Sequence, residues 1–349
     1  MADISKIDTN FAVETSLREE GLKFYDSSDE RFTLYGVFFE NGLFRRLPES
    51  VAQSVSDGVY NLHIHTAGGR VKFVTNSPFV AIKAVMPDIS KMSHFTLTAS
   101  AGFDLYTGKR EEYVASFIPP YDVTGGYEGI VHFGDTKQRE ITLNFPLYSS
   151  VSALYIGLDE DSSLKKASGY KHKKPIVFYG SSITQGGCAS RPGNSYESIV
   201  SRALCSDYIN LGFSGSAKAE DEMAEYIASL DMSAFVYDYD YNAPSVAHLK
   251  NTHGKMFSAI RKKNPDLPIL ILSRPKHRLT DEEKQRLEII RKTYDSAVSS
   301  GDKNTYFIDG QTLMKYARND ATVDGYHPND LGFYSMARAM IPQLKQMIK

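Results

Sequence analysis

The chain has 349 residues, a length typical of two domains, and 42% of them are hydrophobic and 23% charged, as in folded, soluble proteins. Forty basic and 42 acidic side chains leave a formal net charge of −2. No bulk electrostatic attraction to nucleic acid or to an anionic membrane is therefore expected. No apolar run approaches the roughly 18 residues that a membrane span needs. We predict a protein with neither nucleic-acid nor membrane partners.

The cysteines and the first residues bear on the compartment. Cys188 and Cys205 are the only two cysteines, so neither a disulfide framework nor a CxxC metal site is expected. Residues 1–4 lack the basic and then apolar profile of a signal peptide. The expected location is cytoplasmic, with a trimmed secreted protein as the alternative.

The N-terminal half has the pattern of an all-β domain. Between about residues 32 and 158, apolar side chains alternate with a period of two, and Gly and Pro residues separate the runs. Residues 70–74 and 79–85 predict two strands around a turn at 76–78. No convincing long helix interrupts this pattern. We predict a jelly-roll-like β-sandwich over residues 1–165.

After the polar stretch 159–174, short apolar runs alternate with segments of helical period. Thr280 and Glu283 form a capping box ahead of one such helix, and residues 330–348 predict the last. Five buried parallel strands are expected at residues 176–178, 208–211, 234–237, 269–272 and 306–308. This alternation predicts a three-layer, flavodoxin-like α/β domain with a five-stranded parallel sheet over residues 170–349. Ligands of such sheets bind at the carboxyl ends of the strands.

Two segments near strand ends carry side chains for nucleophilic catalysis. Ser182 lies in the segment 179–186 that follows the first strand of the predicted parallel sheet. Asp324 and His327 lie three residues apart, just before the last helix, so the carboxylate can orient the imidazole. Alone, each segment also fits an ordinary loop with a capping Asp or a surface His. Together they favour a serine nucleophile with its general base.

An acyl-transfer site also needs hydrogen-bond donors for the oxyanion. Gly215 follows the second strand, where a glycine lets its N–H approach a ligand closely. Asn242 follows the third strand, and its side-chain amide can donate.

These blocks carry a family resemblance. Ser182 in Gly-Ser-Ser-Ile, Gly215 in Gly-Phe-Ser-Gly, Asn242, and His327 in Asp-Gly-Tyr-His-Pro resemble, in order and spacing, the four blocks of the SGNH (GDSL-type) hydrolases. Residues 101–106, Ala-Gly-Phe-Asp-Leu-Tyr, are similar to the GxDLY motif of the β-sandwich that precedes one bacterial branch of that superfamily. The resemblance extends from about residue 32 to the end.

The resemblance implies a serine esterase that works through an acyl-enzyme, without a cofactor or a metal ion. The roles it implies are Ser182 as nucleophile, His327 as base, Asp324 as its orienting acid, and an oxyanion hole from the Ser182 N–H, the Gly215 N–H and the Asn242 amide. The sequence departs from the family in two places: Ser181 replaces the usual acid of the first block, and Asn242 lacks the common Gly-x-Asn-Asp context.

The substrate implied first is a small acyl ester, with an acetyl group on a sugar or oligosaccharide as the leading candidate. The alternatives are a short-chain lipase or thioesterase that acts on another substrate, and a non-catalytic carbohydrate-binding protein with a decayed site. A homo-oligomer is left open. Arg191 and Arg274 in βα loops, and Asp104 in the GxDLY segment, are candidate substrate contacts. Their alternatives are loop salt bridges for the arginines and a buried turn for Asp104.

Two further pairs of side chains have the spacing of possible metal ligands. Asp238 and Asp240 lie two residues apart, but bonds to neighbouring loop N–H groups are the favoured interpretation. His63 and His65 lack a third ligand nearby in the sequence, so they are expected as exposed strand side chains.

Overall fold

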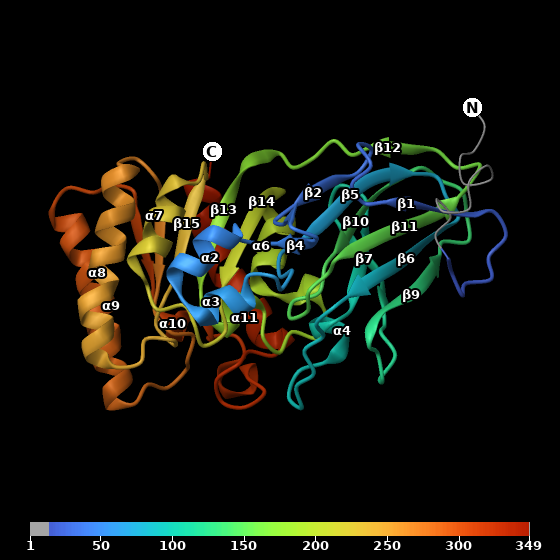
Figure 1. Cartoon of the computed structure of the whole chain (residues 1–349). Helices are drawn as coiled ribbons and strands as arrows, with labels where there is room; N and C mark the ends of the chain where they lie inside the picture. Colours follow the sequence, from blue (N-terminus) through green and yellow to red (C-terminus); the bar gives the residue numbers. More distant parts are fainter. Residues whose placement is uncertain (1–13, 349) are drawn as a thin grey trace.

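Two antiparallel sheets form the N-terminal half of the protein, as the alternating pattern predicts (Figure 1). The computed structural model describes residues 14–348, so residues 1–4, on which the expected location depends, lie outside it. One sheet has the order β1-β11-β6-β9, and the other has the order β12-β5-β10-β7-β8 with β2 paired to β5. The strands are β1 Leu22–Asp26, β2 Thr33–Tyr35, β5 Arg70–Thr75, β6 Phe79–Met86, β7 Phe103–Thr107, β8 Glu112–Phe117, β9 Gly125–His132, β10 Arg139–Asn144, β11 Ala153–Asp159 and β12 Leu164–Lys166.

The turn at residues 76–78 joins two strands that do not pair with each other. β5 pairs with β10, whereas β6 pairs with β11 and β9 in the opposite sheet. Phe73 of β5 and Ile82 of β6 are both fully buried in the core between the sheets. The alternation therefore located both strands, and the turn is a crossing from one layer of the sandwich to the other.

The C-terminal half contains the predicted parallel sheet, with strand order β14-β13-β15-β16-β17. Its strands are β13 His172–Gly180, β14 Ser206–Gly212, β15 Ala234–Asp238, β16 Ile269–Leu272 and β17 Thr305–Ile308. The flanking helices are α6 Tyr196–Leu204, α7 Asp221–Ser229, α8 Val246–Lys263, α9 Asp281–Ser299 and α11 Asp330–Met347. Shorter helical segments are α4 Leu97–Ser100, α5 Ser182–Gln185, η2 Pro192–Asn194, α10 Gly310–Leu313 and η3 Arg318–Ala321. The capping box of Thr280 and Glu283 is formed at the start of α9.

Alternate side chains of β13 pack against the two helical layers on opposite faces of the sheet. Ile176 and Phe178 pack with α6 and α11, whereas Val177 and Tyr179 pack with α7, α8 and α9. Burial on both faces explains why the strands are continuous apolar runs. None of the described helices is long and apolar enough to cross a membrane.

Two short helices of the N-terminal half were not predicted. The hairpin β3 Phe38–Glu40 and β4 Leu43–Arg45 leads into α2 Glu49–Val55 and α3 Asp57–Leu62. Ala52 and Val59 are fully buried in the core on the α7 side of the parallel sheet. The N-terminal half thus completes the core of the C-terminal half, and the division into residues 1–165 and 170–349 stays a prediction.

Arg46 stabilises the contact between the N-terminal and C-terminal halves. Its side chain is 2% exposed, and its guanidinium donates to the carbonyl oxygens of His65, Leu62, Asn210 and Gly212 at 2.6–3.0 Å. Burial lowers the pKa of Arg46 to about 9, which still leaves it charged at neutral pH. A cation held by carbonyls from both halves fixes their relative position.

We expect Arg46→Met to lower the free energy of unfolding by roughly 3–5 kcal/mol, because several buried carbonyl groups lose their donor. The control is Arg31→Met, since the Arg31 side chain is 40% exposed in a local pair with Asp29 and should contribute below about 1 kcal/mol. Urea unfolding followed by circular dichroism measures both changes. Equal effects of the two substitutions would contradict the role assigned to Arg46.

Candidate active site

Ser182 lies where the parallel sheet reverses its order. It begins α5, separated from the end of β13 by Ser181 alone, and β13 lies between β14 and β15. Ligands of open α/β sheets bind at such switch points. Ser181 takes the N-cap position, and its hydroxyl accepts a hydrogen bond from the Ile183 N–H at 3.2 Å. The serine that replaces the family's usual acid therefore still organises the first turn after the strand.

Asp324 and His327 meet Ser182 from the loop before α11. Ser182 Oγ is 2.9 Å from His327 Nε2, and His327 Nδ1 is 2.7 Å from Asp324 Oδ2. Asp324 Oδ1 also accepts the backbone N–H groups of Tyr326 and His327 at 2.9 and 2.8 Å. Three groups that the sequence places in two distant segments thus form one hydrogen-bonded chain.

Asp324 is the member of this hydrogen-bonded chain whose pKa is shifted. Partial burial works to raise the pKa of Asp324, but the hydrogen bonds from the His327 side chain and from the Tyr326 and His327 N–H groups outweigh it and lower that pKa to about 2. The carboxylate is therefore charged at neutral pH and can accept the proton of Nδ1. In the tautomer with the proton on Nδ1, Nε2 carries a lone pair that faces the Ser182 hydroxyl.

Gly215 and Asn242 are held beside the α5 turn by two hydrogen bonds. The Ser214 N–H donates to Gln185 Oε1 of α5 at 3.0 Å, and Asn242 Nδ2 donates to the Phe213 carbonyl at 2.8 Å. Gly215 has φ +68°, and a Cβ built on it meets no atom within 4 Å. Its N–H has no partner in the described part of the chain, so it is free to donate, as is the second N–H of Asn242.

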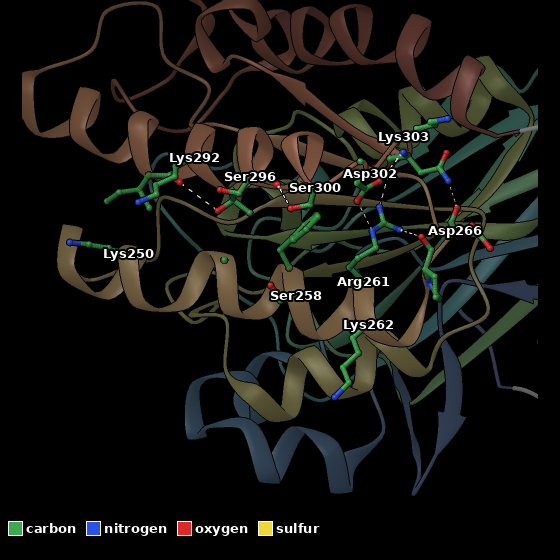
Figure 2. A pocket seen from close by; sticks show the side chains of 18 residues that line it. Lys250, Ser258, Arg261, Lys262, Asp266, Lys292, Ser296, Ser300, Asp302 and Lys303 are labelled. Carbon is green, nitrogen blue, oxygen red and sulfur yellow. Dashed lines mark hydrogen bonds and ion pairs between the residues drawn. The ribbon is translucent and has the colours of Figure 1, made fainter.

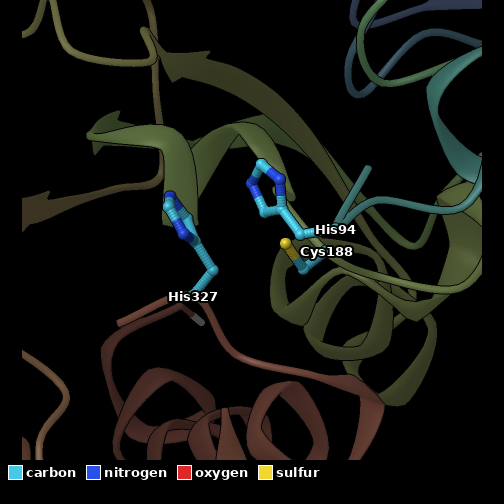
Figure 3. Close-up of side chains that lie close together, drawn as sticks. All are labelled: His94, Cys188 and His327. Atoms are coloured by element: carbon cyan, nitrogen blue, oxygen red, sulfur yellow. The ribbon is translucent and has the colours of Figure 1, made fainter. Parts of the chain in front are cut away.

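The sandwich contributes residues that the sequence analysis missed. The Tyr148 hydroxyl donates to the Ser182 carbonyl at 3.2 Å, and the ring of His94 lies 5.6 Å from that of His327, centroid to centroid. Figure 3 shows His94 reaching toward His327, with the Cys188 side chain beside it. His94 and Tyr148 lie in irregular segments with no motif, so no local signal could have placed them at the site.

Asp104 and Arg191 require a correction. Asp104 is fully buried, and its carboxylate accepts from Asn144 Nδ2 at 2.7 Å, the Gly193 N–H at 2.8 Å and Arg191 at 3.2 Å. The Arg191 guanidinium also bonds to the Tyr106 hydroxyl. Both side chains therefore join the sandwich to the loop after α5, and the buried Asp104 cannot contact a substrate. For Arg191 the alternative of a salt bridge fits the structure better, and for Asp104 the alternative of a buried structural residue fits better.

Arg274 is likewise used internally. It forms a bidentate pair with Asp240 at 2.9 Å and a further bond to Glu283 at 2.9 Å. Its side chain is 10% exposed, so the expectation of substrate binding is corrected to a buried ion pair. Asp240 also faces Arg286, whereas Asp238 accepts from the hydroxyls of Thr184 and Tyr196. The two aspartates thus bind separate partners, neither of which is the loop N–H that the sequence analysis favoured.

His63 and His65 are buried, not exposed on a strand. The neighbours of His63 are Arg45 and the Tyr60 carbonyl, and burial is the main cause that lowers its pKa. His65 lies between Asp88 and Gln185 at 3.4 and 3.2 Å. The expected strand is absent here because α3 ends at Leu62, His63 lies in the turn that follows, and His65 forms only an isolated bridge to Ser150.

The burial of Asp238 is expected to make the stability of the protein depend on pH. Burial raises the pKa of Asp238 to about 7, so the folded protein keeps a proton that the unfolded chain releases near pH 4. The free energy of unfolding should therefore fall as pH rises from about 4 to about 7 and level off above. Asp238→Asn removes this loss and should gain up to roughly 4 kcal/mol relative to wild type across that window. Urea unfolding at pH 4.5 and 7.5 tests it, and parallel pH profiles would contradict it.

A hollow of about 1020 Å³ lies away from this site, between α8 and α9 (Figure 2). Lys250, Lys262 and Lys292 are among the side chains around it, and the Arg261–Asp302 ion pair crosses one end. It contains none of the side chains that the sequence analysis assigned to catalysis. The hydrogen-bonded chain of Ser182, His327 and Asp324, rather than the size of a cavity, therefore defines the candidate active site.

Comparisons with known proteins agree with this architecture. The model of the GDSL-like lipase/acylhydrolase family matches residues 173–345, and a model of the N-terminus of SGNH-hydrolase-type esterases matches residues 22–164. None of the curated proteins compared with the chain matches it.

Three solved structures are similar over almost the whole chain. A protein from Bacteroides ovatus ATCC 8483, classed among the GDSL-like lipases, is 30% identical with a TM-score of 0.84, covering 94% of this chain and 99% of its own. The salicylyl-acyltransferase of a tetracycline biosynthetic pathway is 18% identical (TM-score 0.78, covering 95% and 98%). A family two carbohydrate esterase from Cellvibrio japonicus is 12% identical (TM-score 0.64, covering 93% and 98%). At these low identities, the last two similarities show a shared fold only.

The fold and the family matches define a serine esterase of the SGNH hydrolase type. The chain belongs to the GDSL-like lipase/acylhydrolase family.

Proposed function

We propose that Ser182 is the nucleophile of an acyl-enzyme mechanism, and the hydrogen-bonded chain from Ser182 through His327 to Asp324 is the observation that carries this proposal. Nε2 of His327 takes the Ser182 proton as Oγ attacks the ester carbonyl, and it returns that proton to the leaving alcohol. Water then attacks the acyl-serine by the same route and releases the acid. Asp324 stays ionised and stabilises the imidazolium that forms in each half-reaction.

The negative charge on the carbonyl oxygen needs donors in a fixed position. The N–H groups of Ser182 and Gly215 and the free N–H of Asn242 are proposed to supply them. The bond from Asn242 to the Phe213 carbonyl holds the amide in place before substrate arrives, so little reorganisation accompanies charge formation.

We expect Asn242→Ala to lower kcat by roughly 10²-fold, with little change in KM, because an oxyanion donor acts mainly when charge develops. Steady-state kinetics with 4-nitrophenyl acetate measures both constants. Asn264→Ala is the control, since Asn264 follows the C-terminal end of α8 and its side-chain amide donates to the Ala228 carbonyl instead of a site residue. A near-normal kcat for Asn242→Ala would make that residue a loop support only.

The proposed substrate is a small acyl ester of a carbohydrate, with acetyl as the acyl group. Its support is the shared two-domain fold of carbohydrate esterases, which include an acetyl xylan esterase from Butyrivibrio proteoclasticus at 14% identity and a TM-score of 0.60. The polar side chain of His94 beside the triad also fits a hydrophilic alcohol better than a long acyl chain.

The test compares wild type and Ser182→Ala on 4-nitrophenyl acetate, butyrate and octanoate and on a panel of acetylated mono- and oligosaccharides, with released acetate measured directly. We expect a preference for acetyl and turnover of at least one acetylated sugar. Preference for octanoate would favour the lipase alternative, and carbohydrate binding without hydrolysis of any ester would favour the decayed binding protein.

A further inference from the structure

Three side chains with metal-ligating atoms converge at the edge of the active site. His94, Cys188 and His327 each offer one nitrogen or sulfur atom, and these atoms all lie within 4.8 Å of one another (Figure 3). His94 comes from the segment before α4, Cys188 from the loop after α5, and His327 from the loop before α11. The cluster therefore exists only when the sandwich and the α/β domain are packed together.

The donor set and its dimensions suit a thiophilic divalent ion. Two imidazoles and one thiolate, with water as the fourth ligand, form a tetrahedral Zn²⁺ site of the catalytic type. Zn–N bonds of about 2.0–2.1 Å and Zn–S bonds of about 2.3 Å place such ligand atoms roughly 3.3–3.6 Å apart. Rotation of the exposed His94 side chain can bring its nitrogen closer to the other two atoms, which lie within 4.8 Å of it, and the Cys188 and His327 side chains must supply the rest of the contraction. The exposure of His94 also gives an ion a route from solvent.

His327 is already oriented as a metal ligand. Histidines that bind metals usually donate the other ring N–H to a carboxylate, and Asp324 Oδ2 lies 2.7 Å from Nδ1. The remaining lone pair on Nε2 is the one that now faces Ser182 Oγ at 2.9 Å. An ion bound at Nε2 therefore takes the atom that has to accept the serine proton.

The conformation of Cys188 is also unusual. Its φ is +74°, a left-handed conformation that costs a non-glycine residue about 1–2 kcal/mol, and it directly follows Gly186 and Gly187. Cys188 is buried, with 7% of its surface exposed, and it has no disulfide partner. The chain thus holds a buried thiol in a left-handed backbone conformation beside the His327 imidazole.

We propose that His94, Cys188 and His327 bind Zn²⁺ or a similar thiophilic ion, and that this ion switches the esterase off. On binding, the thiol releases its proton to solvent, the sulfur and the two imidazole nitrogens coordinate the ion, and Ser182 loses its hydrogen bond to Nε2. Inhibition depends on the function proposed above, whereas binding of the ion does not.

The first experiment measures binding, with Co²⁺ as the probe on the chelator-treated full chain. A thiolate ligand gives an intense near-ultraviolet charge-transfer band, and wild type should show it with saturation at one ion per chain. Ser182→Ala should show it too, so the test stands even for an inactive protein. Cys188→Ser should lack the band, whereas Cys205→Ser, the matched control at the end of α6, should keep it.

The second experiment measures hydrolysis of 4-nitrophenyl acetate with and without Zn²⁺, as a ratio within each protein. Wild type and Cys205→Ser should lose at least about ten-fold in rate at saturating Zn²⁺, recover with chelator, and be insensitive to Mg²⁺. His94→Ala and Cys188→Ser should need roughly 100-fold more Zn²⁺. Absence of the Co²⁺ band in wild type, or its retention in Cys188→Ser, overturns the site. A band without inhibition of an active enzyme overturns the switch.

Discussion

Replacing Ser182 with alanine is expected to reduce kcat for 4-nitrophenyl acetate by roughly 10⁴–10⁶-fold. Ser182 Oγ is the hydroxyl that lies 2.9 Å from His327 Nε2, so the proposed acyl-enzyme cannot form once it is removed. Donors for the oxyanion remain, which leaves a small residual rate over water. Stopped assays on purified wild type and variant measure the loss.

The neighbouring Ser181 provides the matched control. Its hydroxyl caps α5 through the Ile183 N–H, so Ser181→Ala should cost about 1 kcal/mol of stability and less than about ten-fold in rate. A serine-directed phosphonate followed by intact-protein mass spectrometry should label wild type and Ser181→Ala. Unchanged labelling of Ser182→Ala would remove Ser182 from the role of nucleophile.

The sheets could be predicted because their strands bury whole segments. β16 is apolar at every position since both of its faces are covered by helices, and β10 alternates because only one face points into the sandwich core. Both patterns are properties of a few consecutive residues, so one sequence is enough to detect them.

The junction between the halves could not be predicted, since its contacts join distant segments. Arg46 binds carbonyls of Asn210 and Gly212, more than 160 residues away, and Asp104 binds the Gly193 N–H across 89 residues. In the sequence Arg46 is one of two adjacent arginines, and Asp104 is part of a motif whose chemistry suggested a ligand. Only the packing shows that both are structural.

The candidate site, too, has parts that the sequence could predict and parts that it could not. Asp324 and His327 are three residues apart, so their pairing is local, and Ser182 has the distinctive position after a buried strand. Whether these groups meet depends on the order of the sheet, which places the loops after β13, β14 and β15 at one edge. Tyr148 enters that edge from the sandwich without any motif, so the sequence gives no means of finding it.

We expect Asp324→Asn to lower kcat by roughly 10⁴-fold while leaving the fold intact. The asparagine oxygen can still accept the Tyr326 and His327 N–H groups, which keeps the loop in place. Its amide would face Nδ1, however, and a donor there forces the ring proton onto Nε2. The imidazole would then point a proton at Ser182 instead of a lone pair, so it could no longer act as the base.

The pH profile separates this account from simple loss of charge. Because the pKa of Asp324 is lowered to about 2, its negative charge and the stability it supplies are complete above about pH 4 and are lost only as pH falls toward 2. Wild-type kcat should therefore show no step from this carboxylate between pH 4 and 9, and Asp324→Asn should stay depressed across that whole range. Asp320→Asn is the matched control, since that exposed side chain lies in η3 outside the triad. Recovery of Asp324→Asn toward wild-type rates at any pH in that range would contradict the tautomer mechanism.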